Sequence, residues 1–576
     1  MLTKIVHLFN KKQKFYLLFI LFLILITMLL ETFTIVAFYP LIDSMINPID
    51  GEKNSIIKFF FQIFNLSNIS NDLYLFYASV IFLSVFVIKS LVLIFCYWHN
   101  THFEFKIRSD LTQKLYKKYL SMPYEKFFKI NSAEIIKNLD YELNLFTSGL
   151  SSIMVIITES TVLIGIVIFL FFFNFKVTLI LISTFITIIF LLNFIYNKKL
   201  VSLGKLTQFY GKLRIQNFIE SFNAIKEIKM FGKEKQFEGQ MRNFNTTFFL
   251  TNKKELFIRT LPRIFLELTI VFAICMYLFF SIYEGIDFKN FIPKISIYLI
   301  AAYRTLPCVN RIITSIQRFK FASPIMNNVC NEAKGEIKNF FNGQVELNNI
   351  KNIYLKNLEF SYSEDSLKII NKINFKFEKN KIYGVVGESG SGKSTLINLI
   401  VGLLNPSSGE LLVDNFKMKD ENYKEFQKLI GYVPQNTFLF ESTIAQNISF
   451  EIESKKYDLE KINRLINILG LEKKVNELEH GLETNVSEKG LNLSGGQIQR
   501  IGIARALYRN PEIIVLDEST NALDTETEEQ IINYINNIKR DKIIILVAHR
   551  KTALKNCDKI IKIENGNLLE VNNKSI

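Results

Sequence analysis

Nine consecutive residues combine three glycines with lysine, serine and threonine, a set suited to holding phosphate groups. The segment reads Gly387-Glu388-Ser389-Gly390-Ser391-Gly392-Lys393-Ser394-Thr395. An apolar run at 381–386 precedes it and a helical pattern follows, which is the strand, loop and helix order of a P-loop. Glycines let backbone N–H groups close round phosphates at a helix N-terminus. We therefore expect Lys393 to contact the β- and γ-phosphates of ATP and Ser394 to ligate Mg²⁺.

A second motif, at 513–518, is an apolar stretch that ends in two carboxylates, Asp517 and Glu518. It predicts a buried strand with both acids at its carboxyl end. Asp517 suits the Mg²⁺ shell, and Glu518 is placed to polarise the water that attacks ATP. Taken alone, the motif also fits an ordinary strand end, so its meaning depends on the neighbouring motifs.

A third motif, Leu493-Ser494-Gly495-Gly496-Gln497, precedes a helical stretch at 498–508. A Ser-Gly-Gly helix start offers bare N–H donors to a phosphate. The P-loop, this signature and the acidic strand, in this order and spacing, resemble the nucleotide-binding domain of the ATP-binding cassette (ABC) superfamily. The resemblance implies an ATP hydrolase that uses ATP and Mg²⁺.

The resemblance also implies roles for residues outside these motifs. Tyr362 resembles the aromatic residue that stacks on adenine, although a core or surface tyrosine is the simpler reading. Gln435 resembles the glutamine that senses Mg²⁺ and the attacking water, which gives an implied metal set of Ser394, Gln435 and Asp517. His549 resembles the switch histidine at the γ-phosphate; a lone histidine at a strand end is usually structural, but its position after the acidic strand favours the switch role. The implied catalytic residues are Glu518, His549 and Gln435, and the implied ATP-binding residues are Tyr362, Gly387, Glu388, Ser389, Gly390, Ser391, Gly392, Lys393, Ser394, Thr395, Ser494, Gly495, Gly496, Gln497 and Asp524.

Two positions depart from the pattern of related exporters. Ser487 stands where glycine is usual, and Asn521 replaces the usual serine four residues after Asp517. Neither change removes a phosphate ligand, but both bear on communication across a dimer. In this family each ATP lies between the P-loop of one subunit and the signature of the other. Because the chain has one of each, the expected active unit is a homodimer, a second copy of the same chain being the partner.

The length and composition predict a membrane part and a separate nucleotide domain. The chain has 576 residues, 49% of them hydrophobic, and nearly all long apolar runs lie before residue 315. We expect a transmembrane domain at 1–320, a linker at 321–343 and an α/β nucleotide-binding domain at 344–576. The formal charge of +15 does not indicate nucleic acid, because the basic residues cluster between apolar spans. The five cysteines show no metal or disulfide pattern.

Six apolar runs are long enough to cross a bilayer as helices, which needs about 20 residues each. The first is too long for a signal-peptide core, so we expect it to remain as a membrane helix. A tight outer turn at Asn174 separates the third and fourth. The six predicted spans are Phe15–Leu41, Leu73–Trp98, Thr147–Phe173, Phe175–Tyr196, Leu256–Tyr283 and Phe291–Ile316.

The distribution of Lys and Arg predicts that both termini are cytoplasmic. Eight basic residues follow span two and twelve follow span four, whereas the opposite connections hold only Lys53, Lys58 and Lys289. The resemblance to bacterial exporters, and not these charges, implies the bacterial inner membrane as the expected location. The outer segment Asn54–Leu66 has an apolar face that fits a short interfacial helix or, equally well, a loop packed on the spans.

The two long cytoplasmic connections, near 99–145 and 197–255, keep a helical rhythm and are expected to continue the membrane helices. Residues 122–136 resemble the first coupling region of ABC exporters, with Ala133 where glycine is common. Residues 224–234 resemble the second. The expected fold is therefore that of a type I ABC exporter half, with six transmembrane helices before the P-loop domain.

Spans five and six show a narrower resemblance, to the lipid-linked oligosaccharide flippases of bacterial protein glycosylation (the PglK type). It rests on the segments 262–267, 303–307 and 310–315. It implies that a polyprenyl-diphosphate oligosaccharide moves from the cytoplasmic to the periplasmic leaflet. Charges at membrane depth usually face a cavity or partner, and guanidinium groups suit a diphosphate. The candidate substrate residues are Arg259, Arg263, Arg304 and Arg311.

Other interpretations of the same residues stay open. The arginines also fit snorkelling to lipid phosphates, or pairing with Glu267. An exporter of peptides, drugs or another lipid would use the same nucleotide-binding domain. A regulatory or ATP-gated membrane protein is a remote alternative. Three further intramembrane charges, Glu31, Lys89 and Glu159, have no role that the sequence assigns.

Overall fold

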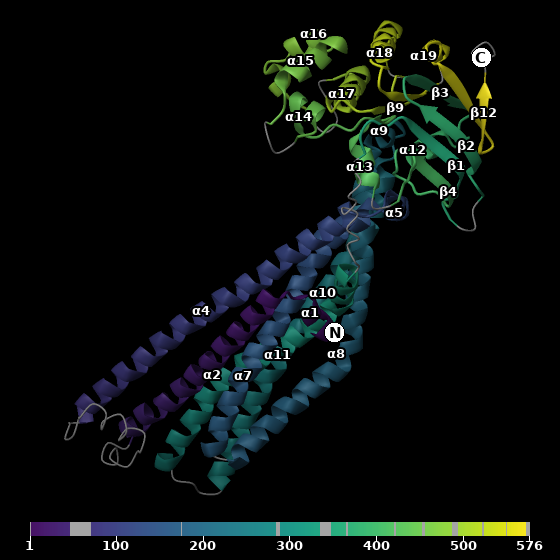
Figure 1. The fold of residues 1–576 in the computed structure, drawn as a ribbon. Helices are drawn as coiled ribbons and strands as arrows, with labels where there is room; N and C mark the ends of the chain where they lie inside the picture. Colours follow the sequence, from purple (N-terminus) through teal and green to yellow (C-terminus); the bar gives the residue numbers. More distant parts are fainter. Residues whose placement is uncertain are drawn as a thin grey trace. The chain divides into compact units, whose positions relative to one another are not determined.

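The computed structural model describes residues 2–46, 71–173, 175–283, 288–334, 347–363, 367–419, 422–451, 456–486, 493–520, 523–548 and 550–571. The chain forms two compact units (Figure 1). The first contains residues 1–120 and 130–337, and the second contains 121–129 and 338–576. The expected interfacial segment Asn54–Leu66 and the turn at Asn174 lie outside the described residues.

The first unit is helical, and each predicted span lies inside one long helix. Three helical segments in the described part of the chain, Lys11–Ile35, Phe82–Leu120 and Ser132–Phe172, are long and apolar enough to cross a membrane. The main helices are α1 (Leu2–Leu8), α2 (Lys11–Ile46), α4 (Asn71–Leu120), α7 (Leu143–Phe173), α8 (Phe175–Asn223), α10 (Glu234–Tyr283) and α11 (Phe288–Lys334). Short helices α6 (Ser132–Lys137), η2 (Asn138–Glu142) and α9 (Ile225–Met230) join them.

Several helices run far beyond the length that a bilayer needs. At 1.5 Å per residue, the 50 residues of α4 extend for about 75 Å, against about 30 Å of hydrocarbon. The expected helical extensions are thus present as parts of α4, α8 and α10. Residues 321–334, which the sequence placed in a linker, are the last turns of α11.

Close helix packing holds the extensions of the first unit together. At Gly204 of α8, an added Cβ would lie 2.1 Å from the carbonyl oxygen of Phe321 in α11. Only glycine allows the two backbones to approach so closely. Phe321 itself is buried in a cluster with Leu200, Leu203 and Ile258, which joins α8, α10 and α11.

The second unit is built on a six-stranded sheet in the order β12-β11-β3-β10-β9-β6. The five strands from β11 to β6 are parallel, and β12 pairs antiparallel with β11 at the other edge. A smaller antiparallel sheet has the order β2-β1-β4-β5. The strands are β1 (Asn352–Phe360), β2 (Ile370–Glu378), β3 (Lys381–Gly387), β4 (Ser408–Val413), β5 (Phe416–Lys417), β6 (Ile430–Val433), β7 (Ser442–Thr443), β8 (Asn485–Val486), β9 (Ile513–Asp517), β10 (Ile543–Val547), β11 (Lys559–Glu564) and β12 (Asn567–Val571).

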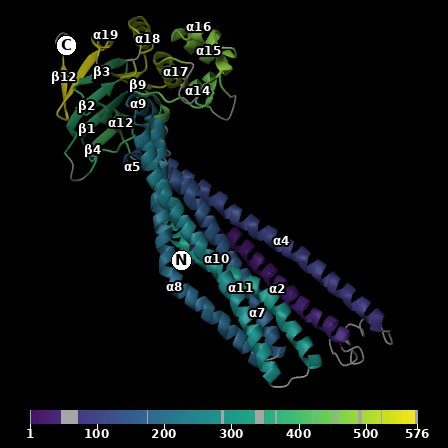
Figure 2. The same cartoon turned by 180° about the vertical axis from the view of Figure 1, so that it is seen from behind.

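Helices cover this sheet and complete the second unit (Figure 2). All five residues of β9 and all five of β10 are buried, as expected for parallel strands covered on both faces. The loops after β3, β9 and β10 leave the same edge of the sheet, where ligands of such folds bind. The helices are α5 (Tyr124–Lys129), α12 (Lys393–Ile400), α13 (Tyr423–Lys428), α14 (Ile444–Ser449), α15 (Leu459–Ile468), α16 (Glu472–Asn476), α17 (Gly495–Tyr508), α18 (Thr525–Asn537) and α19 (Lys551–Leu554), with a 3-10 turn at Gly481–Glu483.

Candidate functional site

The phosphate loop runs from the end of β3 into the first turn of α12. Gly390 and Gly392 adopt φ angles of +82° and +103°, which L side chains rarely adopt. Lys393 is buried, and its Nζ donates hydrogen bonds to the carbonyl oxygens of Gly387 (2.8 Å) and Glu388 (2.9 Å). The lysine therefore lies folded back against its own loop, where it can reach an anion held by the same loop.

The loop has the donors that a nucleotide phosphate requires. The hydroxyl oxygen of Ser391 is buried and has no hydrogen-bond partner among the described residues. A Cβ added to Gly390 would meet nothing within 4 Å, so the backbone there is open to a ligand. The side chain of Ser394 is exposed at the start of α12. These residues fit a triphosphate at the helix N-terminus.

The two predicted acids follow β9 and lie beside the glutamine that the sequence singled out. Asp517 is buried, and Tyr432 of β6 donates to its Oδ2 at 3.4 Å. Glu518 has a φ of 48°, unusual for a residue with a side chain, and its N–H donates to the carbonyl of Val547. Gln435 donates from Nε2 to Oε2 of Glu518 at 2.8 Å. The structure therefore brings Gln435, Asp517 and Glu518 together.

The electrostatics of the site favour a cation. Burial raises the pKa of Asp517 above its ordinary value, and the neighbouring charge of Glu518 raises it further; Tyr432 and Lys393 act in the opposite direction. Two adjacent carboxylates repel each other, and a divalent cation would relieve that repulsion. The hydroxyl of Ser394, the amide oxygen of Gln435 and the carboxylate of Asp517 are hard oxygen donors, as Mg²⁺ prefers. When bound, Mg²⁺ neutralises charge on the phosphates.

The signature segment begins helix α17. Ser494 is its N-cap: its hydroxyl accepts from the N–H of Gln497, whose Oε1 accepts from the N–H of Ser494. This capping box fixes the first turn. Ser494 and Gly495 are exposed, and a Cβ at Gly495 would meet nothing within 4 Å. The N-terminus of α17 is therefore preformed and accessible.

Asp524 caps α18, and its carboxylate accepts from the N–H and the hydroxyl of Thr527. Arg550, which the sequence reasoning missed, donates to the carbonyl of Leu523 (3.2 Å) and to the buried Glu528 (3.1 Å). It ties the loop after β10 to the loop after β9. The predicted switch residue His549, and the departures Ser487 and Asn521, lie outside the described residues.

Tyr362, the candidate adenine partner, follows β1 and is partly exposed. Its ring packs edge-on against Phe360 at 5.0 Å between centroids, and against Phe128 at 5.9 Å. Phe128 belongs to α5, the part of the first coupling region that groups with the second unit. The second coupling region forms α9, followed by Gly232 with φ +60° and an ion pair from Lys229 to Glu234.

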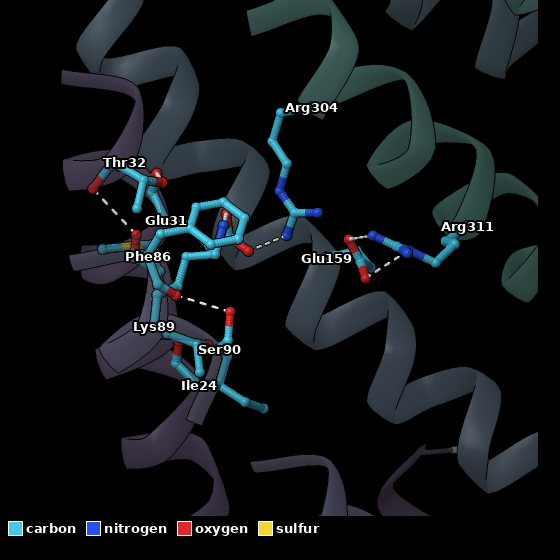
Figure 3. Close-up of polar contacts among 12 residues, drawn as sticks. Ile24, Glu31, Thr32, Phe86, Lys89, Ser90, Glu159, Arg304 and Arg311 are labelled. Atoms are coloured by element: carbon cyan, nitrogen blue, oxygen red, sulfur yellow. Dashed lines mark hydrogen bonds and ion pairs between the residues drawn. The ribbon is translucent and has the colours of Figure 1, made fainter. Parts of the chain in front are cut away.

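Two of the four candidate arginines form ion pairs with carboxylates on other helices (Figure 3). Glu31 of α2 is almost fully buried; it pairs with Lys89 of α4 at 3.2 Å and accepts a hydrogen bond from Arg304 of α11. In Arg311 of α11, Nε lies 2.8 Å from Oε1 of Glu159 in α7, and Nη2 donates to Oε2 at 3.1 Å. Of the three charges that the sequence left unassigned, Glu31 therefore pairs with both Arg304 and Lys89, and Glu159 pairs with Arg311.

The other two candidates, Arg259 and Arg263, line a hollow of about 610 Å³ between α10 and α11. Arg263 pairs with Glu267 one turn away at 2.8 Å, as one alternative reading proposed, yet both side chains remain at least half exposed. Arg318 also lines the hollow and was missed because span six was ended at residue 316. Its signal was the spacing: 304, 311 and 318 are seven residues apart on α11.

Comparisons with known proteins agree with this architecture. Residues 17–300 match the family model described as ABC transporter transmembrane region, and residues 370–521 match that described as ABC transporter. A putative export ATP-binding/permease protein of Rickettsia bellii is 31% identical, over 80% of each chain. An ATP-dependent lipid A-core flippase of Wigglesworthia glossinidia brevipalpis is 28% identical, over 81% of this chain and 80% of that one. A bacterial Atm1-family ABC exporter with ATP bound has a similar structure, with a TM-score of 0.78 at 18% identity over 96% and 94% of the two chains.

Proposed function

Because the chain belongs to the ABC transporter family and is an ATP-driven membrane exporter, we propose that it flips a polyprenyl-diphosphate-linked oligosaccharide from the cytoplasmic to the periplasmic leaflet for protein glycosylation. The nucleotide domain drives the transport by hydrolysing ATP. The part that remains to be assigned is the cargo, and the charges of the transmembrane unit bear on it.

The hollow between α10 and α11 is the observation that carries the proposal. Three arginines line it, Arg259, Arg263 and Arg318, against one acidic lining residue, Glu267. Thr260, Asn310, Thr314 and Ser315 add hydroxyl and amide groups, and Leu256 and Ile264 complete the lining with apolar side chains. One guanidinium group can donate two parallel hydrogen bonds to two oxygens of a phosphate, and hydroxyl groups add uncharged donors. A lipid with a diphosphate headgroup and attached sugars matches this lining.

Two further cations, Lys89 of α4 and Arg304 of α11, lie around a buried carboxylate. Glu31 faces two cations, Lys89 and Arg304, so this group carries a net charge of +1 (two positive charges against one negative). Arg311 and Glu159 together are neutral. An anion that leaves the hollow would thus meet a further positive group at membrane depth, where an unpaired charge is otherwise expensive.

The similarity to lipid A-core flippases supports a lipid cargo over a peptide or drug. A lipid of that class is the second candidate, since it too would present an amphipathic molecule to the same hollow. A peptide or drug exporter would need an apolar cavity, and the three arginines argue against that. The two lipid candidates differ in the headgroup and chain that the assay must supply.

We further propose that two copies assemble, with Ser494 of each copy facing the P-loop of the other. One P-loop and one signature per chain support this arrangement, as does the accessible N-terminus of α17. In each site Glu518 would polarise the attacking water while Gln435 holds its carboxylate. The basic connections after spans two and four support an inner-membrane protein with both termini in the cytoplasm.

The deciding experiment is headgroup flipping in proteoliposomes with a fixed amount of folded protein. The panel holds a polyprenyl-diphosphate oligosaccharide, lipid A-core, and a set of peptides and drugs. We expect ATP-dependent flipping and ATPase stimulation by the first. Glu518→Gln vesicles give the background. Flipping of lipid A-core alone would replace the cargo proposed here, and response only to peptides or drugs would overturn a lipid cargo.

A further inference from the structure

A five-residue π-helix, η2, separates the first coupling region from the long helix α7. It spans Asn138–Glu142, directly after α6. Because a π-turn inserts one extra residue into a helix, side chains beyond it point in new directions, and such turns are frequent at functional positions. In this chain three of the five side chains point to different helices of the first unit.

Glu142, the last residue of η2, is the most buried of them. Its side chain is fully buried, and its carboxylate is the acceptor of three bonds from three elements. Oε1 accepts from Lys137 of α6 at 2.9 Å and from Gln208 of α8 at 2.8 Å. Oε2 accepts from Asn328 of α11 at 2.7 Å. One carboxylate therefore links α6, α8 and α11.

The other residues of η2 extend this contact to the remaining helices. Asn138 donates to the hydroxyl of Tyr119 near the end of α4 at 2.9 Å. Tyr141 packs on Phe248 of α10, at 5.9 Å between ring centroids. It also lies against Gly211 of α8, where an added Cβ would meet its ring at 3.4 Å. The segment thus contacts α4, α8, α10 and α11 within five residues.

The chain connects η2 closely to the nucleotide unit. Residues 121–129, with α5, group with the nucleotide unit, and the first unit resumes at Ile130. Only two residues, Ile130 and Asn131, separate α5 from α6, and η2 follows α6 without a break. The backbone path from α5 to α7 therefore runs through η2.

The chemistry of Glu142 suits transmission better than stability. A buried ion pair contributes little net stability relative to apolar side chains of the same volume. A fully satisfied network of buried hydrogen bonds, in contrast, holds the packed helices in one specific arrangement. Energetic coupling passes through such packed and hydrogen-bonded elements when they have discrete arrangements. We infer that Glu142 is a positioning residue that couples the first coupling region to α8 and α11, so that ATP-driven movement of α5 moves the transmembrane helices.

The test measures amide hydrogen exchange by mass spectrometry with and without ATP and vanadate, and needs no cargo. Wild-type protein should show changed exchange in peptides of α12 and in the extensions of α8 and α11. Glu142→Gln combined with Lys137→Met removes both buried charges of this ion pair together and nearly keeps the side-chain volumes. It should retain the response of α12 and near-normal basal ATPase activity, and lose the response of α8 and α11.

The matched control is Glu332→Gln. Glu332 pairs with Lys118 at the same distance of 2.9 Å but is about one third exposed, and its variant should respond like wild type. A second variant, Asn328→Leu, removes only the bond to α11; it should lose the α11 response and keep that of α8, a division that general destabilisation would not produce. Three results would each overturn the inference: a wild-type response of α8 and α11 in the Glu142→Gln and Lys137→Met double variant, loss of its α12 response, or no response of α8 and α11 in wild type.

Discussion

Gln435 and Glu518 are joined by a hydrogen bond of 2.8 Å from Nε2 to Oε2, although 83 residues separate them in the sequence. The bond holds the carboxylate in one orientation at the end of β9, beside the buried Asp517. Glu518 reaches this orientation through a left-handed backbone with φ of 48°. Residues held in such conformations cluster at sites where geometry matters for function.

Replacing Glu518 by Gln should leave ATP binding intact and lower ATP turnover by between about 10²- and 10⁴-fold, because an amide cannot polarise the water. The purified variant is assayed for phosphate release and for retained nucleotide. Glu441→Gln, an exposed glutamate of the same domain, is the control and should hydrolyse normally. Near-normal turnover of Glu518→Gln would refute the role of this residue.

Ser494→Arg should block the site that faces it while leaving nucleotide binding to the P-loop of its own chain unchanged. A bulky cation at the accessible start of α17 prevents the helix N-terminus from approaching a phosphate. Mixed assemblies of tagged wild-type and variant chains should hydrolyse ATP at one site only. Ser408→Arg on β4 is the matched control, since this serine is also exposed. Full ATPase activity in a detergent-solubilised monomer would contradict the shared site.

In the absence of Mg²⁺, Asp517→Asn should remove a loss of folded-state stability that wild type shows at higher pH. Burial and Glu518 raise the folded-state pKa of Asp517, so this group favours the folded state at low pH, and the contribution is lost as the pH rises through the raised pKa. The variant should thus melt at a higher temperature than wild type at mildly alkaline pH, with the difference shrinking at acidic pH. Added MgATP should stabilise wild type more than the variant. Equal melting of both at alkaline pH would show that Asp517 causes no such loss of stability.

Arg263→Ala should weaken cargo-stimulated ATPase activity and flipping but leave basal hydrolysis unchanged. A hydrogen bond to a charged group contributes about 1.5–3 kcal/mol to the free energy of an interaction. Without it, the apparent KM for the lipid should rise roughly ten- to hundredfold. Lys should restore function only in part, because it lacks the planar fork. The control is Arg242→Ala, since Arg242 pairs with Glu238 in the same helix at the same 2.8 Å. Wild-type flipping per folded molecule would favour snorkelling to lipid phosphates instead.

The corresponding test at Arg311 needs a paired change. Arg311→Ala alone leaves the buried Glu159 without its partner, which confounds transport with folding. Arg311→Met combined with Glu159→Gln removes both charges together. If Arg311 contacts the cargo, this double variant should fold and show reduced flipping with basal ATPase activity retained. Unchanged flipping would confine Arg311 to a structural role.

Glu31→Gln should destabilise the transmembrane unit by about 3–5 kcal/mol, the usual effect of breaking a buried ion pair. Lys89 and Arg304 would then face each other's charge without a carboxylate between them. The melting temperature in detergent and the yield of folded protein measure the effect. The control is Glu238→Gln, which breaks the exposed ion pair of Glu238 with Arg242 in α10, and this variant should melt like wild type. A normal melting temperature for Glu31→Gln would exclude this ion pair as a support of the fold.

The sequence predicts the parts of this protein whose signals are local. The phosphate loop lies between a strand and a helix that adjoin it in the chain, so Lys393 could be placed from its neighbours alone. The six helices follow from their apolar runs in the same way. The approach of Gln435 to Glu518 was anticipated only through the resemblance to a family.

Partners that are distant in the chain could not be predicted in this way. Arg304 and Glu31 lie 273 residues apart, and no periodicity indicates which of several intramembrane charges pair with each other. Glu142 was overlooked because a charged residue at a helix start usually faces solvent, and only the packing of α6, α8 and α11 buries it. The end of span six was drawn where apolar character fades, which left Arg318 outside.

The unbroken length of α4 has a mechanical consequence. It runs from Asn71 to Leu120 without a proline, whereas α10 contains Pro262. A helix about 75 Å long that tilts by about 5° about one end moves its other end through roughly 6 Å, which is more than the rise of one helical turn. A small rotation at the Leu120 end of α4 would thus displace its other end far enough to open a gap between neighbouring helices there.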